Sequence, residues 1–179
     1  MHILELTANV FGLMIGIISA VTDARTRKIY NVVTYPGVLV GFIFHTLAAV
    51  LSQRGIAGFL FSLYGFLLGF GFFFILYWIS RGKKMGAGDV KLYAAVGACF
   101  GLYATLYSLV ITALVGLLVS FALLFPVLYM VIRTGRLSIL QDYKNYPIPY
   151  GTVIGISITI WVIIRMVGLT ENLILPFYI

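Results

Sequence analysis

Two aspartates are the residues of this apolar chain that are best placed to do chemistry. Asp89 follows two closely spaced glycines, Gly86 and Gly88, and opens an apolar run, whereas Asp23 closes an earlier one. Ionisable side chains within membrane segments are costly and mark functional sites. Two carboxylates that lie close together share a proton, because two like charges do not both ionise cheaply. One can then activate a water while the other donates a proton to a scissile carbonyl, so the pair predicts a peptide-cleaving site without metal or cofactor.

Each aspartate also has a simpler interpretation. Asp89 could cap the helix that it begins, since a carboxylate there accepts backbone N–H bonds and suits the helix dipole. Asp23 could pair with Arg25 or Arg27 in the headgroup zone. Capping does not explain glycine at both 86 and 88, because glycine costs backbone entropy and permits another chain to approach closely. The glycines therefore favour a site over a cap.

The composition determines the fold class. Of 179 residues, 62% are hydrophobic and only 9% are charged, and the mean hydropathy is +1.10. Soluble domains carry about 25% charged residues, and about 20 apolar residues of helix cross a bilayer. The chain is therefore predicted to be an all-α, polytopic membrane bundle, with residues 1–179 forming a single domain.

Six helices are expected, the fourth of which is barely long enough to span a membrane. A kink is expected at Pro126, because proline breaks the helical hydrogen-bond ladder. The expected helices are 4–22, 32–51, 56–79, 89–101, 103–132 and 152–167.

The charged loops predict the orientation. Basic residues gather in the odd-numbered connections between helices, and the opposite connections hold only Arg54. By the positive-inside rule, the odd-numbered connections are cytoplasmic, both termini lie outside, and Asp23 and Asp89 share the cytoplasmic edge. Orientation and contact with anionic membrane lipids explain the net charge of +7, so no nucleic-acid partner is predicted. The remaining acids, Glu5, Asp142 and Glu171, are interpreted as solvated charges near the ends or in a loop.

The other polar and small residues predict packing rather than chemistry. His45 is expected to be a hydrogen-bonded interior residue, and Cys99 a buried core residue; neither stands at metal-binding spacing from a second ligand. The pair Gly65 and Gly69 predicts close helix packing inside the bundle or, as an alternative, a dimer face. Trp161 is expected at an interfacial or lipid-facing position.

Residues 85–97, which read MGAGDVKLYAAVG, resemble the G-x-G-D-x-K core of the type IV prepilin peptidases, a group of GxGD aspartyl proteases. Residues 23–31 resemble the first aspartate motif of that family, with Tyr30 in place of a proline. Residues 147–151 resemble a motif before the last helix, and Thr152 stands where many members have another proline. The resemblance covers nearly the whole chain.

This resemblance implies an aspartic endopeptidase of the cytoplasmic (inner) membrane. It would cut a short basic leader from prepilins or pseudopilins, after a glycine, in type IV pilus assembly or protein secretion. Carried over by position, Asp23 and Asp89 are the catalytic pair. The residues expected to bind substrate or shape the motifs are Gly86, Gly88, Lys91, Pro149 and Gly151.

Larger members of that family carry an extra region with paired C-x-x-C motifs and methyltransferase activity. This chain has one cysteine, so it resembles the compact peptidase-only members of tight-adherence pilus systems or the archaeal preflagellin peptidases. Methyltransferase activity is therefore not expected. The alternative functions are a proton-coupled small transporter or channel component, since membrane carboxylates also serve proton relays, and an inactive scaffold of a pilus machine. The transporter predicts acids near mid-membrane, whereas Asp23 and Asp89 are expected at helix ends.

Overall fold

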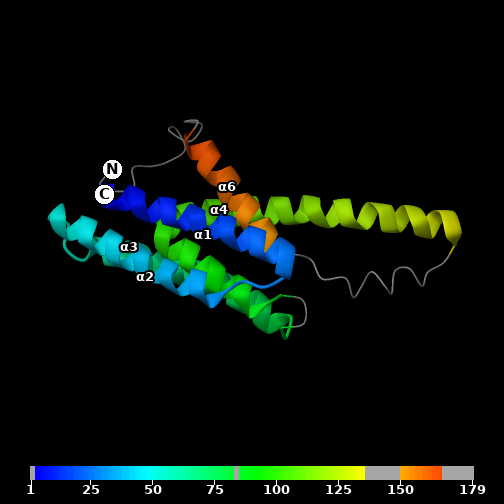
Figure 1. The fold of residues 1–179 in the computed structure, drawn as a ribbon, viewed down its shortest axis with the longest axis horizontal. Helices are drawn as coiled ribbons and strands as arrows, with labels where there is room; N and C mark the ends of the chain where they lie inside the picture. The colour runs from blue at the N-terminus through cyan, green and yellow to red at the C-terminus, as the bar shows by residue number, and fades with distance from the viewer. Residues whose placement is uncertain (1–2, 83–84, 136–149, 167–179) are drawn as a thin grey trace.

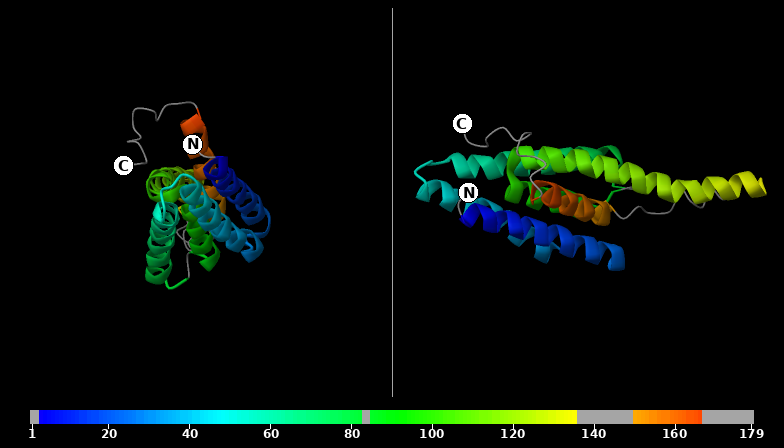
Figure 2. Two further views of the ribbon diagram at one scale, coloured as in Figure 1. Left: turned by 90° about the vertical axis from the view of Figure 1, so that its left-hand side faces the viewer. Right: turned by 90° about the horizontal axis from the view of Figure 1, so that it is seen from above.

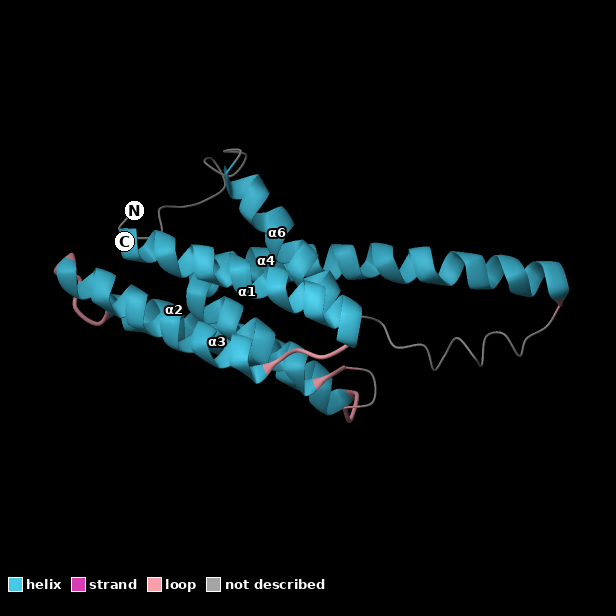
Figure 3. Cartoon of the chain, in the orientation of Figure 1, coloured by secondary structure: helices cyan, strands magenta, loops and turns pink. Residues whose placement is uncertain are grey.

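The computed structural model describes residues 3–82, 85–135 and 150–166, and within these ranges every regular element is a helix (Figures 1 and 3). This confirms the predicted all-α bundle. The helices are α1 (Ile3–Thr26), α2 (Asn31–Leu51), α3 (Ala57–Ile79), α4 (Ala87–Thr134) and α6 (Tyr150–Met166).

Four of these helices, α1 to α4, are long and apolar enough to cross a membrane, and α6 is apolar but shorter. Large apolar side chains are exposed around the bundle, including Leu39, Phe74 and Trp78. A contiguous apolar exterior of this kind requires lipid around it. The protein is therefore a membrane protein, as the composition predicts.

The chain reverses direction inside α4, at Gly101. Its φ of +74° lies in the left-handed region, which glycine adopts without steric cost. The Tyr93 hydroxyl is hydrogen-bonded to Ser108 and Thr112, each at 3.0 Å. In a straight helix, residues 93 and 108 would lie about 22 Å apart. Residues 87–100 and 102–134 therefore form a helical hairpin, and they correspond to the fourth and fifth helices that the sequence predicts (Figure 1).

The backbone angles around Pro126 are helical, since the only non-helical angles inside α4 are those of Gly101, so α4 is not broken there. The kink expected at Pro126 stays a prediction. The second part of α4 is one long helix. Its Gly116 lies level with the first turn of α6, since a β-carbon there would be 3.7 Å from Val153. Residues 117–134 continue past this level for about 27 Å, as Figure 1 shows in yellow.

The first part of α4 is the centre of the bundle, and α4 contacts all four other helices (Figures 1 and 2). Glycines bring α3 and α4 together. A β-carbon on Gly65 would collide with the Gly97 carbonyl oxygen, and one on Gly69 would collide with the Tyr93 carbonyl oxygen. The predicted close packing of Gly65 and Gly69 is therefore inside the bundle and not at a dimer face.

The predictions that His45 and Cys99 are buried are confirmed, whereas the predictions that Trp161 and Glu5 are exposed are corrected. The ring Nε2 of His45 is hydrogen-bonded to the Cys99 carbonyl oxygen at 2.7 Å, and both side chains are buried. Trp161 is not lipid-facing: only 3% of it is exposed, and it stacks on Tyr107. Glu5 is not a solvated charge either.

Glu5 is buried and lies 3.4 Å from a guanidinium nitrogen of Arg54. Arg54 is the one basic residue that the sequence places in the even-numbered connections. The ion pair joins α1 to the turn between α2 and α3, at the end of the bundle opposite to Asp23. Pairing explains how the carboxylate tolerates burial.

Candidate active site

The last turn of α1 carries Asp23, and the first turn of α6 holds its carboxylate. Asp23 is buried, with 7% of its surface exposed. Its Oδ2 accepts hydrogen bonds from the Thr152 backbone N–H at 2.9 Å and from the Thr152 hydroxyl at 3.2 Å. Because helix N-termini present free N–H groups and a partial positive charge, α6 is a favourable partner for a carboxylate.

Gly151 lets α6 approach Asp23 this closely. A β-carbon at position 151 would lie 2.9 Å from the Asp23 carboxyl carbon and 2.9 Å from Ile29 Cδ1. Any side chain at this position would displace the carboxylate. Gly151 therefore lies against Asp23, and its motif-shaping role stays a prediction. Pro149, Asp142 and Glu171 lie outside the described residues.

Thr152 is the site residue that the sequence reasoning missed, having been considered only as a departure from a proline motif. Its hydroxyl and backbone N–H are 129 positions away from the aspartate that they bind. The available signal was a polar residue directly after the Pro-x-Pro-Tyr-Gly stretch, at the start of the last apolar segment.

The sequence resemblance implies leader cleavage, and replacing Thr152 with valine is expected to reduce that activity about tenfold without unfolding the protein. The substitution keeps the shape and the backbone N–H donor but removes the hydroxyl donor, and a hydrogen bond to a charged group contributes about 1.5–3 kcal/mol. The measurement is kcat/KM for leader removal. Thr152→Ser retains the hydroxyl and serves as the matched control; equal losses in both variants would contradict the role of the hydroxyl.

Asp89 lies in the first turn of α4 and is also buried, with 6% exposed. Its Oδ2 accepts a hydrogen bond from the Gly86 backbone N–H at 3.1 Å, and its own N–H donates to the Gly86 carbonyl oxygen at 3.2 Å. Asp89 therefore stabilises the start of its helix, as the capping interpretation requires. This contact uses Oδ2 and leaves Oδ1 for other partners.

The two glycines before Asp89 have different surroundings. A β-carbon at Gly88 would lie 3.0 Å from Ile29 Cβ, so the close approach is made by the α1–α2 connection of the same chain. A β-carbon at Gly86 would have no contact closer than 3.5 Å. Packing therefore explains glycine at 88, whereas the described residues give no steric reason for glycine at 86.

Gly86→Ala is consequently expected to leave thermal stability within about 0.5 kcal/mol of wild type, as is usual at exposed sites, while it raises KM. Gly86 lines the cavity described below, so an added methyl group would occupy space open to a substrate. Gly88→Ala should instead lower stability, because the methyl group must displace Ile29. The two variants are compared by thermal unfolding and by cleavage kinetics, and a stable Gly86→Ala variant with unchanged KM would contradict a substrate-facing role.

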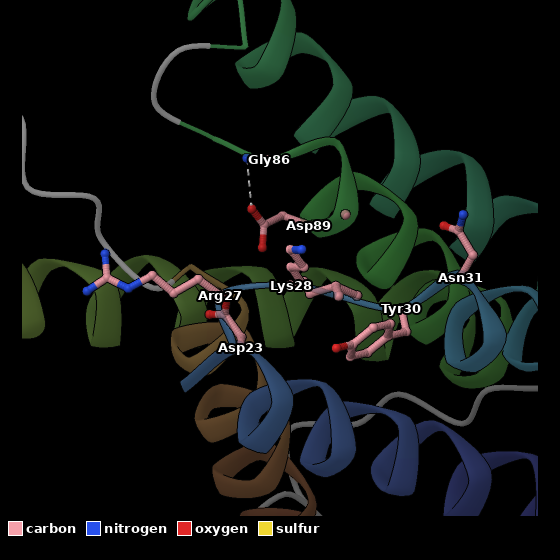
Figure 4. A pocket seen from close by; sticks show the side chains of 9 residues that line it. Asp23, Arg27, Lys28, Tyr30, Asn31, Gly86 and Asp89 are labelled. Atoms are coloured by element: carbon pink, nitrogen blue, oxygen red, sulfur yellow. Dashed lines mark hydrogen bonds between the residues drawn. The ribbon is translucent and has the colours of Figure 1, made fainter. Parts of the chain in front are cut away.

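Asp23 and Asp89 line one cavity of about 360 Å³ at the end of the bundle (Figure 4). They reach it from α1 and α4, and the α1–α2 connection forms a further wall that brings Arg27 and Lys28 to the same cavity. Within the described part of the chain, no hydrogen bond joins the two carboxylates. A cavity of this volume, lined by both carboxylates, has room for a water or a peptide group.

Lys91 lies one helical turn from the cavity and connects two helices. Its ammonium nitrogen donates a hydrogen bond to Asn31 Oδ1 at 3.0 Å, and Asn31 lines the cavity at the start of α2. The ammonium also lies 5.4 Å from the centre of the Tyr35 ring. Lys91 thus links the start of α4 to the start of α2, as a motif-shaping residue would.

Comparison with protein families gives a match to the type IV leader peptidase family over residues 10–121. The matched region is more than half of the chain and contains both aspartates. The chain belongs to the type IV leader peptidase family. The match ends before α6, so Gly151 and Thr152 lie outside it. Neither a search of curated proteins nor a search of solved structures gave a match.

Membership of this leader peptidase family makes the protein a peptidase with a prepilin-type substrate, in agreement with its membrane helices. The family expectation from the sequence is thus confirmed.

Proposed function

We propose that this leader peptidase is an aspartic endopeptidase in which Asp23 and Asp89 form the catalytic pair. The observation that supports the proposal best is their convergence: two buried carboxylates, 66 positions apart in sequence, line the same cavity. Each is held through Oδ2 by a backbone N–H of a helix start, which fixes its orientation. Held in this way, both can act on one substrate group.

In the proposed reaction, the ionised carboxylate of the pair removes a proton from a water that attacks the scissile carbonyl carbon. The protonated carboxyl donates its proton to the carbonyl oxygen, which gives a tetrahedral diol. Collapse of the diol breaks the C–N bond as a carboxyl group of the pair protonates the leaving amine, and the products are a new carboxyl end and a new amine end. Either carboxyl group can serve as the base or as the acid, so neither is assigned a single role.

The proposed substrates are prepilins or pseudopilins with a short basic leader, cut after a glycine, and the proposed site is the cytoplasmic membrane with the aspartates facing the cytoplasm. Basic residues gather at the Asp23 end of the bundle, which supports this orientation. They are Arg25 in the last turn of α1, Arg27 and Lys28 on the α1–α2 connection, and Arg81 after α3. A proton-coupled transporter is less well supported, because Asp23 and Asp89 both lie at one end of the bundle and neither of these two lies in mid-span.

The test uses the purified full-length protein in proteoliposomes with a prepilin-type substrate. We expect one new amine end, directly after the glycine at the end of the leader, detected by mass spectrometry. A substrate in which that glycine is replaced by leucine is the matched control and should remain uncut. Failure of the folded protein to cut any of several prepilin-type substrates, or cutting of the control at the same rate, would contradict the proposal.

A further inference from the structure

A second cavity, of about 470 Å³, lies on the outside of the bundle between α2, α3 and the start of α4. We call it the lateral groove. Apolar side chains from the three helices form its walls, and Lys91 is the only charged residue among those described residues that line it. A single cation beside an otherwise apolar groove at the edge of the membrane attracts an anionic partner such as a lipid headgroup.

The lateral groove has a charged end near Asp23 and an apolar end deeper in the bundle. The helix α2 runs away from the Asp23 end, and the groove follows it from Tyr35 to Leu39; α4 likewise runs from Lys91 to Ala94. The helix α3 runs in the opposite direction, so Phe66 lies deeper than Phe70. The cation therefore sits at the end nearest the basic loops, and the deeper part of the groove is apolar.

The Lys91 ammonium retains capacity for an anion. It has three N–H donors, and its contacts within the described residues are one hydrogen bond to Asn31 Oδ1 at 3.0 Å and the face of the Tyr35 ring, whose centre is 5.4 Å away. Asn31 and Tyr35 fix the position of the Lys91 amine at the end of the lateral groove nearest the basic loops. No carboxylate among the described residues forms an ion pair with it.

The surface around the groove faces the bilayer. Leu39 is 60% exposed and Tyr35 is 54% exposed, and both lie in α2, which is long and apolar enough to span the membrane. Lipid acyl chains therefore contact the deep apolar part of the lateral groove. The Lys91 ammonium, at the end nearest the basic loops, favours a negatively charged headgroup. We propose that the lateral groove binds one anionic phospholipid, with its phosphate at Lys91 and an acyl chain along Leu39, Phe66 and Ala94.

This site is distinct from the proposed catalytic cavity, but it adjoins that cavity. Asn31 lines the catalytic cavity and contacts Lys91, which lines the lateral groove. A bound phosphate would share the Lys91 ammonium with Asn31. The bound lipid would thus hold the starts of α2 and α4 in place beside Asp89.

The test uses the full-length protein in phosphatidylcholine nanodiscs that contain a small fraction of a photoactivatable phospholipid with the reactive group in its acyl chain. The probe carries either a phosphatidylglycerol or a phosphatidylcholine headgroup. After illumination, mass spectrometry locates the labelled peptides. We expect the anionic probe to label residues 35–39 and 66–70 about fivefold more than the neutral probe, which corresponds to the attraction of about one lysine.

Three variants make the assignment specific. Lys91→Met should reduce labelling by the anionic probe to the level of the neutral probe. Arg81→Met removes one exposed positive charge near the same end without changing the groove, so it should leave the preference intact. Leu39→Trp should fill the deep apolar part of the lateral groove and therefore reduce labelling by both probes.

Protection of the buried Cys99 thiol from a maleimide dye verifies that each variant is folded. Equal labelling of the wild-type protein by the two probes would overturn the proposal, as would a preference that survives Lys91→Met. Displacement of both probes by an apolar helical peptide, without discrimination between headgroups, would show that the groove binds peptide and would also overturn it.

Discussion

Asparagine in place of either Asp23 or Asp89 is expected to lower kcat for leader removal by about a thousandfold, within the range that a general acid or base contributes. The amide retains the size of the carboxyl group, and its oxygen can still accept the Thr152 or Gly86 backbone N–H. It cannot exchange a proton with water or with the scissile carbonyl. The loss should therefore appear in the chemical step and not in folding.

The measurement is single-turnover cleavage of a prepilin-type substrate, with the products separated by mass spectrometry. Because the two groups act as a unit, the double variant should be no slower than the slower single variant. Glu5→Gln is the matched control: it also neutralises a buried carboxylate, but this one pairs with Arg54 at the opposite end of the bundle. Either aspartate variant with activity within tenfold of wild type would contradict the proposed pair.

The helices of this protein were largely predictable from the sequence, because each apolar run is a local property of the chain. Even the reversal in α4 was predicted within a residue, since the expected fourth helix ends at Gly101. Pro126 does not end the helix, because proline removes one backbone hydrogen bond but the angles around it stay helical. Gly101 reverses the chain because it takes left-handed angles.

The relation between helices was less predictable, because it depends on packing between residues far apart in sequence. The charge pattern predicted that Asp23 and Asp89 share one end of the bundle, but not that they line one cavity. The contact of Thr152 with Asp23 depends on how α6 packs against α1, and Gly151 controls that distance. The pairing of Glu5 with Arg54 was missed for the same reason: neither residue reveals its partner by spacing.

The second large effect is expected at Gly65, where alanine should destabilise the protein by about 1–3 kcal/mol, the usual cost of overpacking. Glycine-to-alanine changes inside helices ordinarily stabilise by about 0.5–1 kcal/mol, because alanine loses less backbone entropy. At Gly65 the sign should reverse, because the new methyl group would collide with the carbonyl oxygen of Gly97. Separation of α3 from α4 would also displace the segment that carries Asp89, so leader cleavage should fall as well.

Gly71 provides the matched control in the same helix. A β-carbon there has no neighbour within 4 Å among the residues that the structure describes, so Gly71→Ala should be neutral or stabilising. The chain contains its own reporter of unfolding, since its one cysteine, Cys99, is fully buried. A thiol-reactive dye followed during heating in detergent should therefore react earlier in Gly65→Ala and no earlier in Gly71→Ala. Equal shifts in both variants would mean that the glycine contact between α3 and α4 does not hold the bundle together.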